Sequence, residues 1–403
     1  MIFEILAAIL IGCIAGTITG LIPGIHINLV SLLLVSISGY FLGFTSPLVL
    51  VVFIIAMAVT HTFVDVIPSV FLGAPDADQA LSALPGHRLL LKGRGFEAVR
   101  LATMGSLLCL ITTILIIPLL APFIPFIFSF LQPFIGWILL FVVALMIWRE
   151  KGIKKLWGLF VFLISGILGL IVLNGNLYIE QPLLPLLSGL FGVSMLIIAL
   201  TRTSWIPVQE ISETIHLSKK ELVKVIGAGT FAGSLTGLFP GLGAAQAAII
   251  GNEVIGKIRD YAFIVLVGGV NTVNFVFSLL TLFAIEKARN GAVVAAQEII
   301  SSINVYSLVV FLCAALIAGG IAVFLTMYFA RVFARIITKI DYSYLCTSVI
   351  AFVSLLVLYF SSWAGLLVLI VASFTGMIPT LVKVKKSHAM GVLLLPVILY
   401  FIL

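Results

Sequence analysis

The sequence predicts an all-α polytopic membrane protein made of two inverted-topology repeats, each with a helix broken at Pro-Gly. Three observations support this fold class. The 403 residues are 62% apolar and only 9% charged, with a mean hydropathy of +1.32. Apolar runs of helix length follow one another along the chain, and a glycine-rich segment near the N-terminus returns in the second half. Because soluble proteins carry about a quarter of charged residues, the composition excludes a soluble enzyme.

The apolar runs predict the membrane-spanning helices. A helix needs about 20 apolar residues to cross a bilayer, so the chain has room for roughly ten crossings. Short clusters of Lys and Arg lie between the runs and account for the net charge of +7. This distribution is typical of cytoplasmic loops and argues against nucleic acid as a partner, so we expect a multi-pass protein of the cell membrane, surrounded by the lipid bilayer. The runs occupy roughly residues 2–22, 25–44, 46–73, 100–121, 122–147, 156–173, 182–200, 222–239, 241–256, 261–285, 299–330, 343–360, 362–381 and 389–403.

An internal duplication is the strongest signal in the sequence. Residues 12–24 read GCIAGTITGLIPG and residues 229–241 read GTFAGSLTGLFPG, with eight of 13 positions identical at an offset of 217. Glycines four apart lie on nearly one helical face, which lets a second helix approach closely, and the Pro-Gly that follows must end the helix. The two glycine ladders are Gly12, Gly16, Gly20 and Gly24, and Gly229, Gly233, Gly237 and Gly241.

A fainter correspondence follows each ladder. Thr62, Asp65 and Ser69 are spaced i, i+3, i+7, and Asn271, Asn274 and Ser278 repeat that spacing at an offset of 209. In an apolar helix such a triplet forms one polar stripe, which must face protein or water rather than lipid. We therefore divide the chain into a first membrane repeat, 1–210, and a second, 211–403.

The basic residues predict that the two repeats are inverted. The stretches 149–155, 201–224, 331–339 and 383–386 are basic and therefore expected in the cytoplasm, whereas 174–181 contains no Lys or Arg. Single crossings between these stretches give each repeat an odd number of spans. The second repeat then enters the membrane from the opposite side.

The Pro-Gly breaks predict a binding site for a small anion. A break leaves free backbone N–H groups at the positive end of the next helix, which binds anions without a charged side chain. The competing interpretation is that the ladders only pack helices and that Pro-Gly is only a turn. The matched pair of breaks, each with polar residues beside it, favours a site. Its candidate residues are Thr19, Gly20, Pro23, Gly24, His26 and Asn28 in the first repeat, and Thr236, Gly237, Pro240, Gly241, Gly243 and Gln246 in the second.

The polar stripes predict a coupling or gating site at Thr62, Asp65, Asn271 and Asn274. Asp65 is the only acid well inside a predicted span apart from Glu253, near the end of its run. A lone carboxylate there needs water, a cation or a partner. We expect no cofactor beyond a coupling ion, Na⁺ or H⁺. The alternative is that Asp65 only pairs with His61, four residues earlier. A membrane enzyme using these two residues is disfavoured, because a local pair within the polar stripe explains them. A metalloprotease is disfavoured because the sequence has no HExxH motif and its five histidines are scattered.

These motifs carry a resemblance to a known family. The pattern Gly-x-x-x-Gly-x-x-Pro-Gly that opens each repeat resembles the TctA-type large membrane subunit of the tripartite tricarboxylate transporters. Most of the chain resembles the family loosely, and the family's Gly-Gly-Ser helix is replaced by Thr60-His61-Thr62. The resemblance implies a permease for tricarboxylates or other organic acids, with a small membrane subunit and an extracytoplasmic binding protein as partners. The further segments that carry it are Gly73-Ala74-Pro75-Asp76, Pro85-Gly86-His87-Arg88, Lys92-Gly93-Arg94-Gly95 and Leu190-Phe191-Gly192.

The functional prediction combines these features. Inverted repeats with broken helices at the substrate are a recurring design of secondary transporters. The first hypothesis is a non-enzymatic permease for a small organic anion, of the tricarboxylate or carboxylate kind, driven by an ion gradient. The alternative is a flippase for a lipid-linked anion such as polyprenyl phosphate, because paired helix N-termini suit a phosphate equally well.

Overall fold

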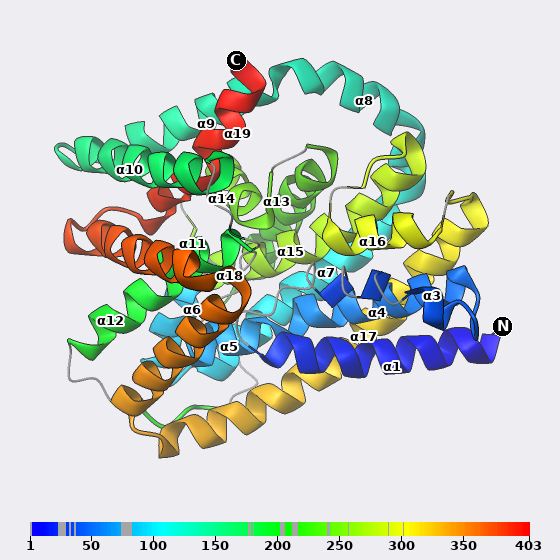
Figure 1. Ribbon diagram of the computed structural model, residues 1–403, viewed down its shortest axis with the longest axis horizontal. Coiled ribbons are helices and arrows are strands. Elements are labelled where there is room, and N and C mark those ends of the chain that lie inside the picture. Colours follow the sequence, from blue (N-terminus) through cyan, green and yellow to red (C-terminus); the bar gives the residue numbers. More distant parts are fainter. Residues whose placement is uncertain are drawn as a thin grey trace.

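Helices make up most of the described chain in the computed structural model (Figure 1). The structure describes residues 2–22, 30–31, 34–35, 38–73, 83–175, 179, 181–201, 206–211, 217–239, 242–256, 258–288, 290–300 and 302–403, and contains no strand among them. Within this part of the chain, eight helical segments are long and apolar enough to cross a membrane. The predicted all-α, multi-pass class is therefore confirmed.

The described helices have the following bounds in chain order. They are α1 (Ile2–Leu21), α3 (Ser38–Phe41), α4 (Pro47–Val64), α5 (Val66–Phe71), α6 (Ala83–Leu90), α7 (Gly95–Leu120), η1 (Ala121–Phe123), α8 (Ile124–Leu131), η2 (Gln132–Phe134), α9 (Ile135–Trp148), α10 (Lys154–Asn174), α11 (Leu183–Leu187), η3 (Ser188–Val193), α12 (Ser194–Leu200), α13 (Lys219–Leu238), α14 (Ala244–Ile255), α15 (Asp260–Ile285), α16 (Gly291–Ile299), α17 (Val305–Ile336), η4 (Ile337–Lys339), α18 (Tyr342–Leu381), η5 (Lys386–Met390) and α19 (Gly391–Ile402).

Several helix ends follow from local side-chain chemistry. Ser46 precedes α4, and its hydroxyl accepts a hydrogen bond from the Val49 amide over 3.4 Å. Ser218 and Glu221 form a reciprocal capping box at the start of α13, which satisfies amides that lack a partner within the helix. Inside α18, Ser362 has φ 57° and interrupts the helix, at the position where the sequence predicts a boundary between two spans.

Prolines divide the predicted span 122–147. Pro122, Pro125 and Pro133 each lie in the first positions of a new helical segment, where a residue without an amide hydrogen is tolerated. The result is the short helix α8, which arches along the edge of the molecule (Figure 1), followed by α9. This stretch is therefore a chain of short helices rather than one straight span.

The first glycine ladder packs α1 directly against α4, and the two helices run side by side (Figure 1). A Cβ atom added at Gly12 would lie 2.6 Å from the Phe53 carbonyl oxygen, and one at Gly20 would lie 2.9 Å from Val64 Cβ. The opposite face of α1 is apolar and exposed, with Ile14 and Ile18 more than half accessible. α1 thus has one face for close helix packing and one face suited to lipid.

The second ladder packs α13 against α15 in the same way. A Cβ atom added at Gly233 would lie 2.5 Å from Val273 Cβ, and one at Gly237 would lie 3.0 Å from the Phe277 carbonyl carbon. The two copies of the motif therefore make equivalent contacts. In each, the glycine face meets the helix on which the polar stripe begins, which is α4, leading into α5, in the first repeat and α15 in the second.

The two halves of the sequence are interleaved in space. α17, from the second half, packs against α4, and α7, from the first half, packs against α15. A further group is formed by α10, η3, α12, α18 and α19, which contact one another in pairs. The packing units are therefore α1–α4–α17 and α13–α15–α7, rather than the two halves of the chain.

The inverted orientation of the two repeats remains a prediction that chemical labelling tests. Asn176 lies outside the described residues, in the stretch without Lys or Arg, and Ser218 precedes α13 in the basic linker. We expect an impermeant thiol reagent applied from outside to label Asn176→Cys but not Ser218→Cys, each in a cysteine-free background. Labelling of both cysteines from the same side would contradict the inverted arrangement.

Candidate transport site

The chain is non-helical on both sides of the second Pro-Gly. α13 ends at Leu238, and Phe239 after it is extended, with φ −105° and ψ 125°. α14 begins at Ala244, after Gly243 with φ −83° and ψ 172°. The Ala247 amide donates to the Gly243 carbonyl oxygen over 3.1 Å. The amides before Ala247 have no partner within the helix, as an anion site requires.

Gln246 lies in the first turn of α14 and is the most informative candidate on this helix. Its side chain is only 2% exposed, and its Oε1 has no hydrogen-bond partner among the residues that the structure describes. A Cβ atom added at Gly243 would lie 2.8 Å from this oxygen, so the carboxamide folds back over the start of the helix. Because rotation of a carboxamide exchanges its oxygen and its NH₂ group, Gln246 is able to offer either a donor or an acceptor to a ligand.

Thr19 and Thr236 occupy equivalent positions in the two ladders. Each hydroxyl donates to the carbonyl three residues earlier, Thr19 to Gly16 over 3.2 Å and Thr236 to Gly233 over 2.6 Å. The next residues, Gly20 and Gly237, lie in tight helix–helix contacts. The remaining candidates lie outside the described residues; they are Pro23, Gly24, His26, Asn28, Pro240 and Gly241.

The two polar stripes meet at Asp65. This residue separates α4 from α5 and is 3% exposed. Asn271, in the middle of α15, donates from Nδ2 to Asp65 Oδ2 over 3.2 Å. The Thr62 hydroxyl donates to the Val59 carbonyl oxygen of its own helix over 2.8 Å, and Asn274 is buried in α15. Residues 206 positions apart thus share one buried polar contact.

His61 has a partner that sequence reasoning missed. Its Nδ1 lies 3.1 Å from Thr19 Oγ1, so the contact joins α1 to α4 beside the first glycine ladder. One sequence feature pointed to this contact, because Thr19 directly precedes the ladder glycine Gly20. In the structure Gly20 packs on the turn that contains His61. His61 is therefore connected to the candidate anion site as well as to the polar stripe.

Two arginines, Arg88 in the last turn of α6 and Arg94 just before α7, contact the start of α15. Arg88 forms an ion pair with Asp260 at 3.4 Å. Arg94 pairs with Glu97 at 2.8 Å and also donates to the Tyr261 hydroxyl. These contacts fix the α6–α7 turn to the second half of the chain. Among the residues that the structure describes, no group of three or more His, Cys, Asp or Glu side chains is placed to hold a metal ion.

The fold and these paired contacts define a multi-pass helical membrane protein with a duplicated glycine-ladder motif. The chain belongs to the tripartite tricarboxylate transporter TctA family, whose model matches residues 6–391. It is thus a membrane component of a tricarboxylate transporter family, and the resemblance found in the sequence is confirmed. The chain is also similar to an uncharacterized protein of Methanocaldococcus jannaschii, at 33% identity over 406 residues that cover 98% of each chain. No solved structure matches the chain.

Proposed function

We propose that this chain translocates a small organic anion of the tricarboxylate or carboxylate class, coupled to a Na⁺ or H⁺ gradient. The substrate is held between the two Pro-Gly breaks that follow the glycine ladders. The observation that carries the proposal is Gln246 in the first turn of α14, a buried carboxamide whose oxygen has no partner in the described part of the chain. The family match supports a carboxylate as the substrate class.

The chemistry of the site suits a carboxylate. The N-terminus of a helix carries roughly half a positive charge, which favours an anion. The amides before Ala247 provide donors at fixed positions, and the Gln246 carboxamide adds one more. A site made of such neutral donors holds an anion without burying a permanent cation, which is expensive within a membrane. It therefore releases its substrate readily.

Alternating access requires two bodies that move against each other around the site. We assign these bodies to the packing units α1–α4–α17 and α13–α15–α7, because the halves of the chain are interleaved. Each body contains one glycine ladder. The bond between Asp65 and Asn271 then joins the two bodies, so a change in its state is able to alter their relative position.

The coupling ion belongs at this contact between the two bodies. Carboxylate, hydroxyl and amide oxygens are the ligands that hard cations prefer, and Thr62, Asp65, Asn271 and Asn274 offer such groups. A proton on Asp65 is the other form of coupling. In either case the bound cation or proton neutralises the negative charge of Asp65, and the ion gradient drives this neutralisation.

A lipid-linked anion remains the alternative substrate, and the family match does not favour it. The tripartite family also suggests the partners. We propose that the chain works with a small membrane subunit and an extracytoplasmic binding protein, with the small anion delivered to the outer side of the membrane.

A binding measurement on the purified chain tests the proposed site. A carboxylate that binds the folded state at a hundredfold excess over Kd stabilises it by about 2.7 kcal/mol, which raises the melting temperature. Gln246→Leu is expected to weaken binding roughly tenfold or more, because a buried hydrogen bond to a charged ligand is lost. Gln132→Leu, on the exposed segment η2, is the matched control and should leave the affinity unchanged. Equal affinity of Gln246→Leu and wild type would contradict the site.

A further inference from the structure

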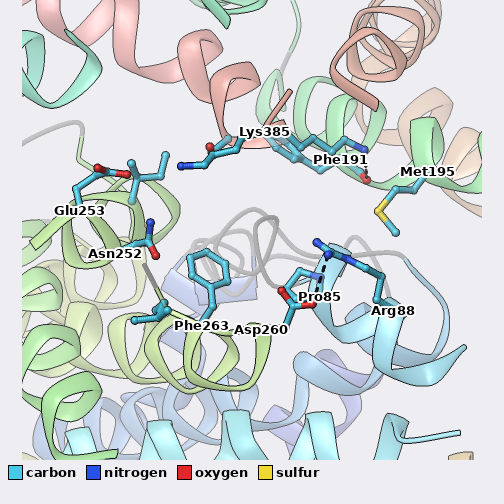
Figure 2. Close-up of a pocket in the computed structure, with 13 residues that line it drawn as sticks. Pro85, Arg88, Phe191, Met195, Asn252, Glu253, Asp260, Phe263 and Lys385 are labelled. Atoms are coloured by element: carbon cyan, nitrogen blue, oxygen red, sulfur yellow. Dashed lines mark hydrogen bonds and ion pairs between the residues drawn. The ribbon is translucent and has the colours of Figure 1, made fainter. Parts of the chain in front are cut away.

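A separate cavity of about 240 Å³ lies where six helical elements from both halves of the chain meet (Figure 2). α6 and the start of α15 line one side, η3, α12 and η5 line another, and the second half of α14 closes it. Cavities for drug-sized ligands measure roughly 300–1,000 Å³, so this one suits a smaller molecule. Its charged lining residues are Arg88, Glu253, Asp260, Lys385 and Lys386.

Lys386 is an unusual residue in this cavity. It is only 7% exposed, and its ammonium donates to the Phe191 carbonyl oxygen over 3.2 Å and to Ser194 Oγ over 2.8 Å. Both acceptors are neutral. Burial lowers the pKa of Lys386 to about 7, because removal from water disfavours the charged form. Within the described part of the chain the ammonium has no carboxylate partner, so an anion bound beside it would stabilise its charged form.

The acidic residues of the cavity already have partners. Glu253 forms an ion pair with Arg149, which lies at the end of α9. Asp260 pairs with Arg88 at 3.4 Å, and Figure 2 shows this pair on the side of the cavity opposite Lys385. The charges of Lys385 and Lys386 are therefore not neutralised by these acids. Counted over the residues that the structure describes, the lining has an excess of positive charge around a space of small-molecule size.

We infer that this cavity is a second binding site for a small anion, a short di- or tricarboxylate whose oxygens meet Lys385, Lys386 and Asn252. The site is distinct from the Pro-Gly break, although α14 contributes to both. Gln246 and Asn252 are six residues apart on this helix, so at 1.5 Å per residue the two sites are separated by roughly 9 Å along its axis. The stretch 383–386 is predicted to be cytoplasmic, which makes the cavity a vestibule on that side. The vestibule role rests on the proposed function, whereas the binding does not.

The test measures citrate binding calorimetrically to the purified full chain carrying Gln246→Leu, in which the break site is weakened. We expect this protein to retain binding, and Lys385→Gln added to it to lower the remaining affinity roughly tenfold, because a charge-assisted hydrogen bond is lost. Lys385 is exposed, so its replacement does not disturb the fold. Lys386→Met is the second variant and should have a larger effect. Lys224→Gln, an exposed lysine on α13 away from the cavity, is the control.

The outcomes separate this inference from the proposed function. Absence of citrate binding to the Gln246→Leu protein, or the same affinity with and without Lys385→Gln, would overturn the second site. A different result would contradict the proposed site at the Pro-Gly break: the single variant Gln246→Leu would then bind citrate with the affinity of the wild type. An effect of Lys224→Gln equal to that of Lys385→Gln would also overturn the inference, because general surface charge would explain it.

Discussion

Proteoliposomes that contain Asp65→Asn are expected to lose uptake driven by an imposed ion gradient, at least tenfold, while exchange of internal for external substrate continues. Asp65 is buried between α4 and α5 and accepts a hydrogen bond from Asn271 of the other packing unit. Asparagine preserves the size of the side chain and its acceptor oxygen. It removes the charge that a cation or proton neutralises, so binding and movement persist while coupling is lost.

The control for this experiment is Asp341→Asn. Asp341 is exposed and caps α18 through hydrogen bonds to the amides of Ser343 and Tyr344, and asparagine is an equally good cap. Driven uptake by this variant should equal that of wild type. If Asp65→Asn retains full gradient-driven uptake, Asp65 is a structural residue and the proposed coupling site is wrong.

The variant Gly233→Val is expected to prevent stable packing of α13 on α15. The new side chain would begin 2.5 Å from Val273 Cβ and 3.1 Å from the Val270 carbonyl oxygen. Neither atom is at the end of a flexible side chain, so the helices must separate. Overpacking of this kind costs about 1–3 kcal/mol. We expect a lower melting temperature in detergent and a larger fraction of aggregated protein.

Gly227→Val provides a matched control on the same helix. A Cβ atom added at Gly227 would meet no neighbouring element of the described chain within 4 Å, and valine is a slightly better helix former than glycine. This variant should melt at or above the wild-type temperature. Equal melting temperatures for the two variants would show that the glycine ladder does not hold the helices together.

The fold and the role of the ladders follow from the sequence because they depend on local periodicity. Glycines four residues apart must share a helical face, whatever packs against it, and the structure places Gly12 and Gly233 on such contacts. The interruption of α18 at Ser362 also lies at the boundary that the sequence predicts between the runs 343–360 and 362–381. Such features need no knowledge of which helices are neighbours.

The partners across the two repeats did not follow from the sequence. The repeat spacing pairs Asp65 with Asn274, whereas the hydrogen bond in the structure comes from Asn271, one turn earlier. Which residue meets Asp65 depends on how α4 and α15 pack against each other, and periodicity within each helix contains no such information. The sequence places Lys386 in a basic run that is expected to face the cytoplasm. Its burial could not be predicted, because it arises from contacts with η3 and α12, nearly 200 residues earlier in the chain.

We propose that this chain moves a carboxylate across the membrane, driven by an ion gradient. The most direct test is uptake of radiolabelled citrate and related carboxylates by proteoliposomes that contain the chain together with the proposed small membrane subunit and binding protein, with a Na⁺ or pH gradient imposed across the membrane. The account predicts accumulation above the external concentration that collapses when an ionophore dissipates the gradient, and that empty liposomes do not show. Carboxylates that stabilise the purified protein but show neither accumulation nor exchange in these proteoliposomes would contradict it.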